Sequence, residues 1–365
     1  MVIVPGAISS FPTLPEDVLL IVFDFYRASS KGRAAHTWPW KQLVHVCQTW
    51  RRLVFAFPCR LDLSLLCNSK NARKTLSIWP ALPIIIRSSE YALSPSPYNN
   101  DDGENIFAAL EHRDRVCKIE LKNTAYCLLK RLSAVMQEPF PALTGLYLSS
   151  NDHAHPVLLD KLLGGSAPNL QHLDLDGIPF PALPKLLLSA THLVRLRLRR
   201  IPYSGYISPE AMASSLANLP NLDTLVVEFH PPRPLSDREN RRPPPLTRLV
   251  LPALTTLEFQ GASEYLEDLV AQIDAPQLNC VKSRFFNQLT FDNPQLSKFI
   301  DRTEMLKTLS RAEVQILSDV VKIALGSTIG RGKLEFSIAC CQPDWQVSSM
   351  AQLCSQLPGL ISRVA

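Results

Sequence analysis

The sequence predicts an α/β protein in which an N-terminal helical module precedes a solenoid, a curved parallel sheet with helices on its outer face. Three observations lead to this prediction. A capped apolar segment begins near residue 13, a second amphipathic segment spans residues 43–57, and a short leucine motif recurs between residues 143 and 262. The first two have the apolar spacing of helices, and the third has the alternation of strands.

Composition limits the classes of function. The chain has 365 residues and a formal net charge of +5, and its basic residues are scattered rather than clustered, which disfavours nucleic acid as a partner. Its nine cysteines include no CxxC pair, which favours a reducing compartment. Residues 1–12 form a tail without the features of a secretory signal, and no stretch has the length of a membrane span. We therefore expect a protein of the cytoplasm or nucleus with no membrane partner.

The first helix is expected to begin just after Thr13. In "TLPEDVLLIVFDFY" Thr13 and Glu16 form a capping box, and Pro15 suits the first helical turn. The segment from Val18 to Tyr26 is apolar on nearly every side, so one face can pack within its own module while another needs a second partner. Residues 27–40 are polar and contain Gly and Pro, which predicts a loop.

A second helix is predicted from "LVHVCQTWRRLV", residues 43–54. Its apolar residues recur with helical spacing from Leu43 to Phe57, and the polar side chains take the opposite face. Such a stripe, taken alone, is more often a core face than a binding face. The segments on either side are therefore needed to interpret it.

Together, "LPEDVL" at 14–19 and "LVHVCQTWRRLV" closely resemble the F-box, the three-helix module that docks substrate receptors on the Skp adaptor of cullin-RING ubiquitin ligases. The resemblance covers about residues 13–67, although the loop at 27–40 is longer than in compact F-boxes. Further segments are similar to the large F-box families of mushroom-forming fungi. The resemblance implies that the apolar stripe is both core and docking surface. The adaptor-binding residues it implies are Leu14, Pro15, Glu16, Val18, Leu19, Val22, Leu43, Val46, Cys47, Trp50 and Leu53.

Residues 68–110 are expected to form a linker and a first strand–helix unit. The run of three isoleucines at 84–86 predicts a buried strand, residues 94–105 a loop, and residues 106–115 a helix. The segment "VCKIEL" at 116–121 then predicts the next strand. This alternation is the beginning of a repeat.

Residues 111–365 are predicted to form an irregular leucine-rich-repeat-like domain. The motif L-x-x-L-x-[LVF] occurs in phase at 143–151, 170–178, 193–201, 222–230 and 254–262, with weaker copies at 116–121 and 278–283. The spacing brackets that of leucine-rich repeats. Only one unit carries the closing Asn, Asn151, so a regular horseshoe is not expected. The proline-rich stretch at 230–246 is interpreted as a surface loop rather than a dedicated recognition motif.

The strands are expected to point their leucines inward and to expose the residues between them. If the strands are parallel and in register, acidic and basic side chains alternate between neighbours. Asp174 and Asp176 would then pair with Arg197 and Arg199, for about 0–1 kcal/mol per exposed pair. The same surface could instead capture a protein target, and the sequence leaves both interpretations open. The candidate target-binding residues are Tyr147, His172, Asp174, Arg195, Arg197, Arg199, Glu228 and Glu258.

Other motifs do not support catalysis. "GSTIGRGKL" at 326–334 has five residues between Gly326 and Gly332 where a phosphate loop has four, and Leu334 replaces its hydroxyl, so a turn is predicted. His153 and His155 lack the further ligands of a zinc site. We expect neither an enzyme nor a bound metal or cofactor.

The C-terminal region predicts a strand at 334–341 and a helix at 344–356. The following "LPGLISRVA" matches the entry to another repeat, so we expect either a truncated gene model or a strand at 360–364 on an exposed sheet edge.

The F-box resemblance implies a substrate-recognition subunit of an SCF-type ubiquitin ligase, whose repeats bind a target for ubiquitin-dependent degradation. The alternative is a repeat scaffold that binds no ligase and whose F-box-like helices only cap the solenoid. The outer face of residues 14–23 separates the two, because a cap would hide it and a receptor would leave it apolar and exposed.

Overall fold

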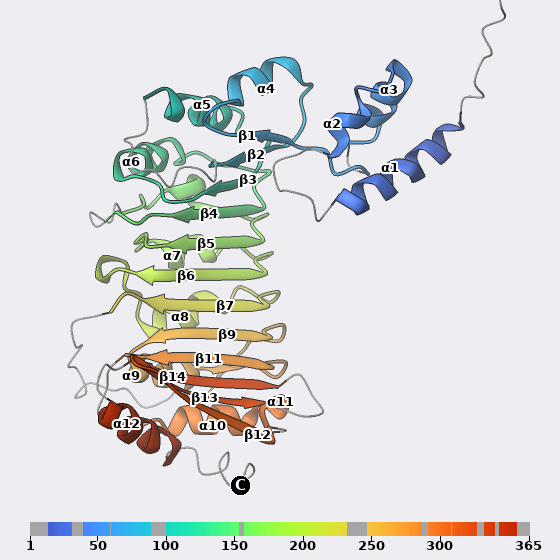
Figure 1. Cartoon of the computed structure of the whole chain (residues 1–365). Coiled ribbons are helices and arrows are strands. Elements are labelled where there is room, and N and C mark those ends of the chain that lie inside the picture. Colours follow the sequence, from blue (N-terminus) through green and yellow to red (C-terminus); the bar gives the residue numbers. More distant parts are fainter. Residues whose placement is uncertain are drawn as a thin grey trace, which may run out of the picture.

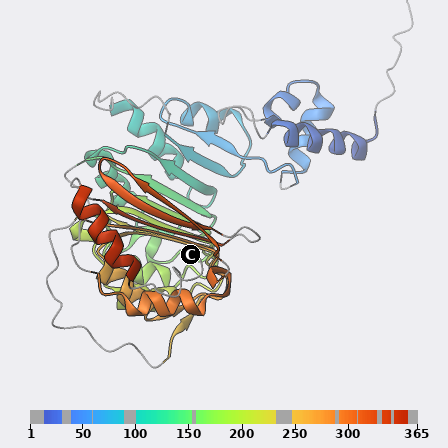
Figure 2. The same cartoon turned by 60° about the horizontal axis from the view of Figure 1, so that its bottom comes forward.

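The computed structural model describes residues 14–30, 39–58, 60–88, 100–152, 157–231, 247–286, 291–307, 309–326, 332–339 and 343–355. Within these residues the chain has a solenoid-like α/β architecture. One large, mostly parallel sheet runs through the molecule, and α7, α8 and α9 lie behind it (Figure 1). The view in Figure 2 shows helices packed along one side of the sheet.

Three helices precede the sheet: α1 (Glu16–Ser30), α2 (Pro39–Leu43) and α3 (Gln48–Ala56). The prediction of one continuous helix over residues 43–57 is wrong, because the chain turns at residues 44–46. Two β-branched valines in this turn disfavour a helix. Cys47 then caps α3, and its sulfur accepts a hydrogen bond from the Trp50 N–H at 3.5 Å. The expected loop at 27–40 is also shorter than predicted, because α1 extends to Ser30.

The large sheet has twelve strands in the order β1-β2-β3-β4-β5-β6-β7-β9-β11-β14-β13-β12. Its parallel strands are β1 (Leu65–Cys67), β2 (Ile84–Arg87), β3 (Val116–Leu121), β4 (Gly145–Ser149), β5 (His172–Asp176), β6 (Arg195–Ile201), β7 (Thr224–Phe229), β9 (Thr256–Gly261), β11 (Cys280–Phe285) and β14 (Lys333–Ala339). Every strand predicted from the leucine motif is therefore present, and β1 adds a strand at the end of the segment with F-box resemblance.

The predicted parallel register is confirmed. Leu146, Leu173, Leu196 and Leu225 are partners across β4 to β7, and all four are buried. Since side chains alternate along a strand, the residues between the leucines share the opposite face. The leucine layer forms the core, and the second face carries the charged residues.

The connecting helices are short and differ from one unit to the next. They are α4 (Ala72–Ile78), α5 (Asn100–Leu110), α6 (Tyr126–Val135), η1 (Leu162–Gly165), α7 (Leu183–Leu187), η2 (Tyr203–Gly205), α8 (Pro209–Leu216), α9 (Ser263–Val270), α10 (Pro294–Arg302), α11 (Glu304–Lys307) and α12 (Pro343–Ser355). A separate two-stranded sheet pairs β8 (Leu249–Val250) with β10 (Ile273–Asp274). This variation fits an irregular repeat.

The prediction of a loop through residue 105 is wrong, because α5 already begins at Asn100. The helix buries Ile106, Ala109 and Leu110, and this packing outweighs the helix-weakening effect of Gly103. At the other end, the predicted helical residues 111–115 form turns that lead into β3.

Asn151 links neighbouring strand ends instead of closing a regular ladder. Its side-chain amide donates to Asn123 Oδ1 at 2.7 Å, and its Oδ1 accepts from Arg200 Nη1 at 2.7 Å. Both partners have a positive φ, 52° at Asn123 and 47° at Arg200. Side chains of different units thus replace the repeated Asn that the sequence lacks.

The C-terminal end of the sheet departs from the repeat. β12 (Arg311–Ile316) and β13 (Val320–Gly326) form an antiparallel hairpin that pairs with β14, and the sequence analysis did not predict it. The "GSTIGRGKL" segment joins two antiparallel strands, β13 and β14, whereas a phosphate loop joins a strand to a helix. The predicted edge strand at 360–364, the paired histidines 153 and 155, Thr13 and residues 232–246 of the proline-rich loop lie outside the described residues.

Candidate functional site

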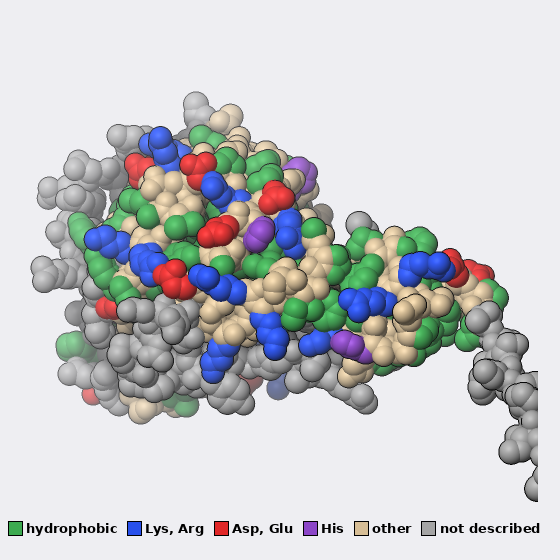
Figure 3. All heavy atoms as spheres, turned by 90° about the horizontal axis from the view of Figure 1, so that it is seen from above, with side chains coloured by type: hydrophobic (Ala, Val, Ile, Leu, Met, Phe, Trp, Pro, Cys, Tyr) green, Lys and Arg blue, Asp and Glu red, His purple; other side chains and the backbone are tan. Residues whose placement is uncertain are grey.

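An uncovered apolar surface lies along α1. Leu14, Val18, Ile21, Val22 and Phe25 are between 36 and 70% exposed, and we call these five residues the α1 face. Their spacing places them on one side of the helix. In Figure 1, α1 extends away from the sheet, and Figure 3 shows hydrophobic side chains spread over the lobe that these N-terminal helices form.

The opposite side of α1 explains why the helix can keep this face free. Leu19, Leu20 and Phe23 are buried against the other two helices. The Phe23 ring meets the Trp50 ring edge-on, with 4.9 Å between the centroids. Ion pairs from Arg52 to Glu16 at 3.2 Å and from Arg60 to Asp24 at 3.0 Å link the exposed flanks. Three buried apolar residues thus anchor the helix, and the residues of the α1 face remain exposed.

The residues implied as adaptor-binding divide between these two environments. Leu19, Leu43 and Leu53 are buried and form the core of the three helices, while Trp50 is half-buried. The exposed members are Leu14, Pro15, Glu16, Val18, Val22, Val46 and Cys47. Ile21 and Phe25 also belong to the exposed surface. The sequence analysis missed both because it took its residues from the F-box motif, although their helical spacing from Leu14 and Val18 could have revealed them.

A second surface lies on the face of the sheet opposite the leucine layer. All eight candidate target-binding residues share this face, which we call the charged sheet face. His172, Asp174, Arg195, Arg197 and Arg199 gather on the central strands β5 and β6 (Figure 1). Tyr147, Glu228 and Glu258 lie on the flanking strands β4, β7 and β9. The sequence therefore identified one continuous surface.

The ion pairs on this face differ in part from the predicted ones. Arg199 lies 3.8 Å from Asp174 and 4.0 Å from Glu228, so it bridges two strands. Asp176 pairs with Arg200 instead of Arg199. The prediction that Arg197 would take one of the two aspartates is wrong, because no carboxylate of the described residues lies within 4 Å of it. The positive φ at Arg200 brings its side chain back to β5, which strand alternation alone does not predict.

Burial and pairing shift the pKa values of the acidic groups in two directions. Burial raises the pKa of Asp174, and Arg199 offsets this only in part. Burial likewise raises the pKa of Glu228. Burial also acts on Glu120, but hydrogen bonds from Lys118 and Arg87 outweigh it and hold the pKa below its ordinary value. The ionised form is therefore stabilised less at Asp174 and Glu228, in the centre of the face, than at Glu120 on β3.

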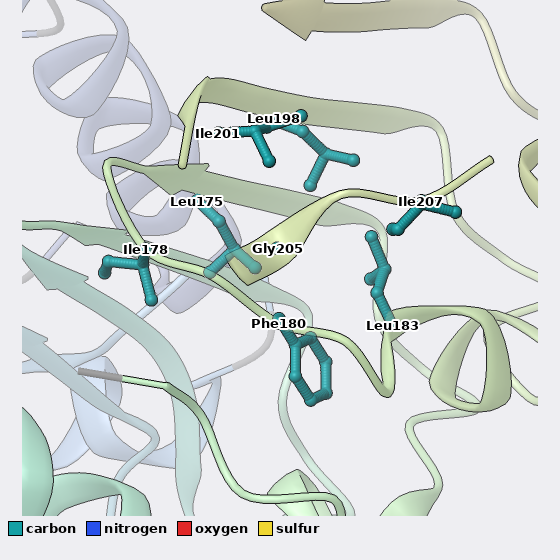
Figure 4. A pocket seen from close by; sticks show the side chains of 8 residues that line it. All are labelled: Leu175, Ile178, Phe180, Leu183, Leu198, Ile201, Gly205 and Ile207. Atoms are coloured by element: carbon teal, nitrogen blue, oxygen red, sulfur yellow. The ribbon is translucent and has the colours of Figure 1, made fainter. Parts of the chain in front are cut away.

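The described residues present neither a metal site nor a disulfide. They contain no group of His, Cys, Asp and Glu residues arranged to hold a metal ion. The six cysteines described are free. A small hollow between β5, β6 and α7 is lined only by apolar side chains and one glycine (Figure 4), and its lining residues are Leu175, Ile178, Phe180, Leu183, Leu198, Ile201, Gly205 and Ile207. It is a gap in the core without a polar group to orient a ligand.

In the part of the chain that the structure describes, no helix combines the length and apolar character needed to cross a bilayer. Comparison with protein-family models and with curated proteins gave no match to the chain. The sheet topology by itself defines the class of protein: a solenoid-like α/β protein with a large, mostly parallel sheet.

Proposed function

We propose that the chain is the substrate-recognition subunit of an SCF-type cullin-RING ubiquitin ligase. In this proposal, the N-terminal helices are an F-box that docks a Skp-type adaptor, and the sheet belongs to an irregular leucine-rich repeat that binds a target protein. The observation that supports it best is the α1 face, which leaves five apolar side chains in contact with solvent. Contiguous exposed apolar surface of this kind is typical of a protein interface.

The scaffold alternative predicts a different environment for α1. Helices that only cap a solenoid bury their apolar face against its end repeat. Here the buried side of α1 faces the other two N-terminal helices, with Phe23 against Trp50. The side chains of the α1 face remain 36 to 70% exposed. This arrangement favours the receptor proposal.

The proposed contribution of the chain is positional. Binding an adaptor at one end and a target on the sheet raises the effective concentration of a target lysine near the ubiquitin-loaded enzyme. Neither surface requires a nucleophile or a general base. The chain would therefore act without performing bond chemistry itself.

Co-expression with a Skp-type adaptor tests the proposal. We expect a stoichiometric complex with the unmutated chain and its loss with the double substitution Val18→Asp and Val22→Asp, because charges on the α1 face would lie unpaired in the interface. Leu188→Asp is the matched control, since Leu188 is an exposed apolar residue next to α7, far from α1 in the sequence. Failure of the unmutated chain to co-purify with the adaptor contradicts the proposal. Trp50 is unsuitable for this test because it packs against Phe23.

A further inference from the structure

The ion pairs of the charged sheet face leave one group of cations without an acidic partner. The carboxylates of this face pair with basic residues: Glu120 with Arg87 and Lys118, Asp174 and Glu228 with Arg199, Asp176 with Arg200, Glu258 with Lys282, and Glu335 with Lys322 and Lys333. His172, Arg195 and Arg197 have no described carboxylate within 4 Å. Arg284 also has none, but it lies alone on β11, three strands from β6.

The three unpaired residues are neighbours at the centre of the sheet. His172 and Arg195 are register partners on β5 and β6, and Arg197 follows two residues along β6. On the other side of His172, its register partner is Gly145, which has no side chain to cover it. We call Arg195 and Arg197 the β5–β6 cation cluster; His172 lies beside them with a lowered pKa, as a neutral side chain at pH 7.

Two further observations describe the surroundings of the cluster. The Arg197 Nε is buried and has no hydrogen-bond partner among the described residues. The pKa of His172 lies below its ordinary value because of burial and then because of the charges of Arg195, Lys118 and Arg197. The nearest acidic group, Asp174, is held by Arg199, and its second oxygen Oδ1 is buried without a hydrogen bond.

We infer that the β5–β6 cation cluster binds the carboxylates of an acidic, extended segment of a partner protein. The inference deepens the proposed function, on which it rests for identifying that partner as the ubiquitination target. Guanidinium groups are suited to carboxylates because their planar N–H donors match the two oxygens. Arg195 is exposed and Arg197 is half-buried, so a carboxylate can reach their guanidinium groups from solvent.

The spacing of the cluster indicates the form of the segment. Residues two apart along a strand are separated by roughly 6.6 Å, which is the separation of Arg195 and Arg197 along β6. The same distance separates alternate residues of any extended chain. A segment with Glu or Asp at alternate positions therefore presents two carboxylates at the spacing of the two arginines.

Binding of defined peptides to the full chain tests the inference. The probe is a fluorescein-labelled Gly-Ser-Glu-Ser-Glu-Ser-Glu-Gly peptide, and its counterpart has Gln in place of each Glu. We expect fluorescence anisotropy to show binding of the glutamate peptide only, weakened about tenfold or more by the combined change of Arg195→Gln and Arg197→Gln. Arg284→Gln, the matched control on the same face, should leave the affinity unchanged. Asp174→Asn should raise the affinity, because it removes a negative charge at the register partner of Arg197.

Two results would overturn the inference. One is equal binding of the glutamate and glutamine peptides, and the other is equal weakening by Arg284→Gln and by the Arg195 and Arg197 pair. Adaptor co-purification is measured on the same proteins. If the unmutated chain binds the adaptor but not the glutamate peptide, only this inference is contradicted, whereas peptide binding without adaptor binding contradicts only the ligase proposal.

Discussion

The α1 face and the charged sheet face expose opposite kinds of chemistry. On α1, apolar side chains such as Ile21 are exposed although the helix is already anchored by Phe23 on its other side. On the sheet, charged side chains are half-buried and most of them pair with a neighbouring strand. Apolar surface gains free energy whenever a partner removes it from water, whereas paired charges contribute mainly to the choice of partner. The difference suggests a constant partner for α1 and a selected one for the sheet.

The largest expected effect compares a leucine of the sheet core with a valine of the α1 face. Leu196 is fully buried, so Leu196→Ala should lower the free energy of unfolding by about 2–5 kcal/mol. Val22→Ala should change it by less than about 0.5 kcal/mol, because Val22 lies at the surface and is 43% exposed. Urea denaturation of both variants measures the difference. Equal destabilisation by the two changes would show that the α1 face is part of a core.

A smaller loss of stability is expected at Gly177, in the turn that follows β5. Gly177 has a φ of 71°, and a Cβ at this position would lie 2.3 Å from the Ser150 carbonyl oxygen. Gly177→Ala should therefore cost more than about 1 kcal/mol. Gly326→Ala is the control, since a Cβ there meets no atom within 4 Å. Thermal unfolding checks this prediction, and an unchanged Gly177→Ala midpoint would contradict the described strand-end packing.

The smallest expected effect is a pH dependence of stability, and it has opposite signs at two carboxylates of the charged sheet face, Glu335 and Asp174. Burial raises the pKa of Glu335, but hydrogen bonds from Lys322 and Lys333 outweigh it and leave the pKa lowered. A lowered carboxyl pKa stabilises the fold above the unfolded pKa, and this stabilisation is lost as the pH falls through the folded value. Glu335→Gln should therefore destabilise the protein at pH 7 by about 1 kcal/mol or less, and the difference should be lost as the pH falls through the lowered pKa of Glu335.

Asp174 should behave in the opposite sense because burial raises its pKa. The unmutated protein then gains stability from this group as the pH falls through the folded pKa. Asp174→Asn should consequently stabilise the protein slightly at pH 7 and have no effect below about pH 4. Denaturation curves at the two pH values test both substitutions. A loss of stability on Asp174→Asn at pH 7 would mean that Arg199 compensates this carboxylate fully.

The strands were predictable because their signal is local and repeats. Alternating leucines at a roughly constant period place the core face and the charged face of β4, β5 and β6 without further information. The β12–β13 hairpin was missed because it interrupts that period. Asp176 pairs with Arg200 rather than with Arg199 because Arg200 has a positive φ. An arginine at position 200 gives no indication of this backbone conformation.

The two surfaces were predictable to different degrees. The charged sheet face follows from register alone, so all eight candidate residues were found on it. The α1 face was only partly identified, because the motif does not tell which of its apolar residues pack inside. Burial of Leu19, Leu43 and Leu53 depends on how the three helices meet, and that contact includes the turn at 44–46 that helical periodicity does not predict.

Hydrogen exchange of the full chain, alone and with a Skp-type adaptor, tests the central claim most directly. The proposed function predicts that the adaptor slows exchange of the backbone amides of residues 16–30 and 48–56, while exchange in β5 and β6 stays unchanged because the target surface remains free. Absence of protection in the N-terminal helices, or protection confined to β5 and β6, would contradict it.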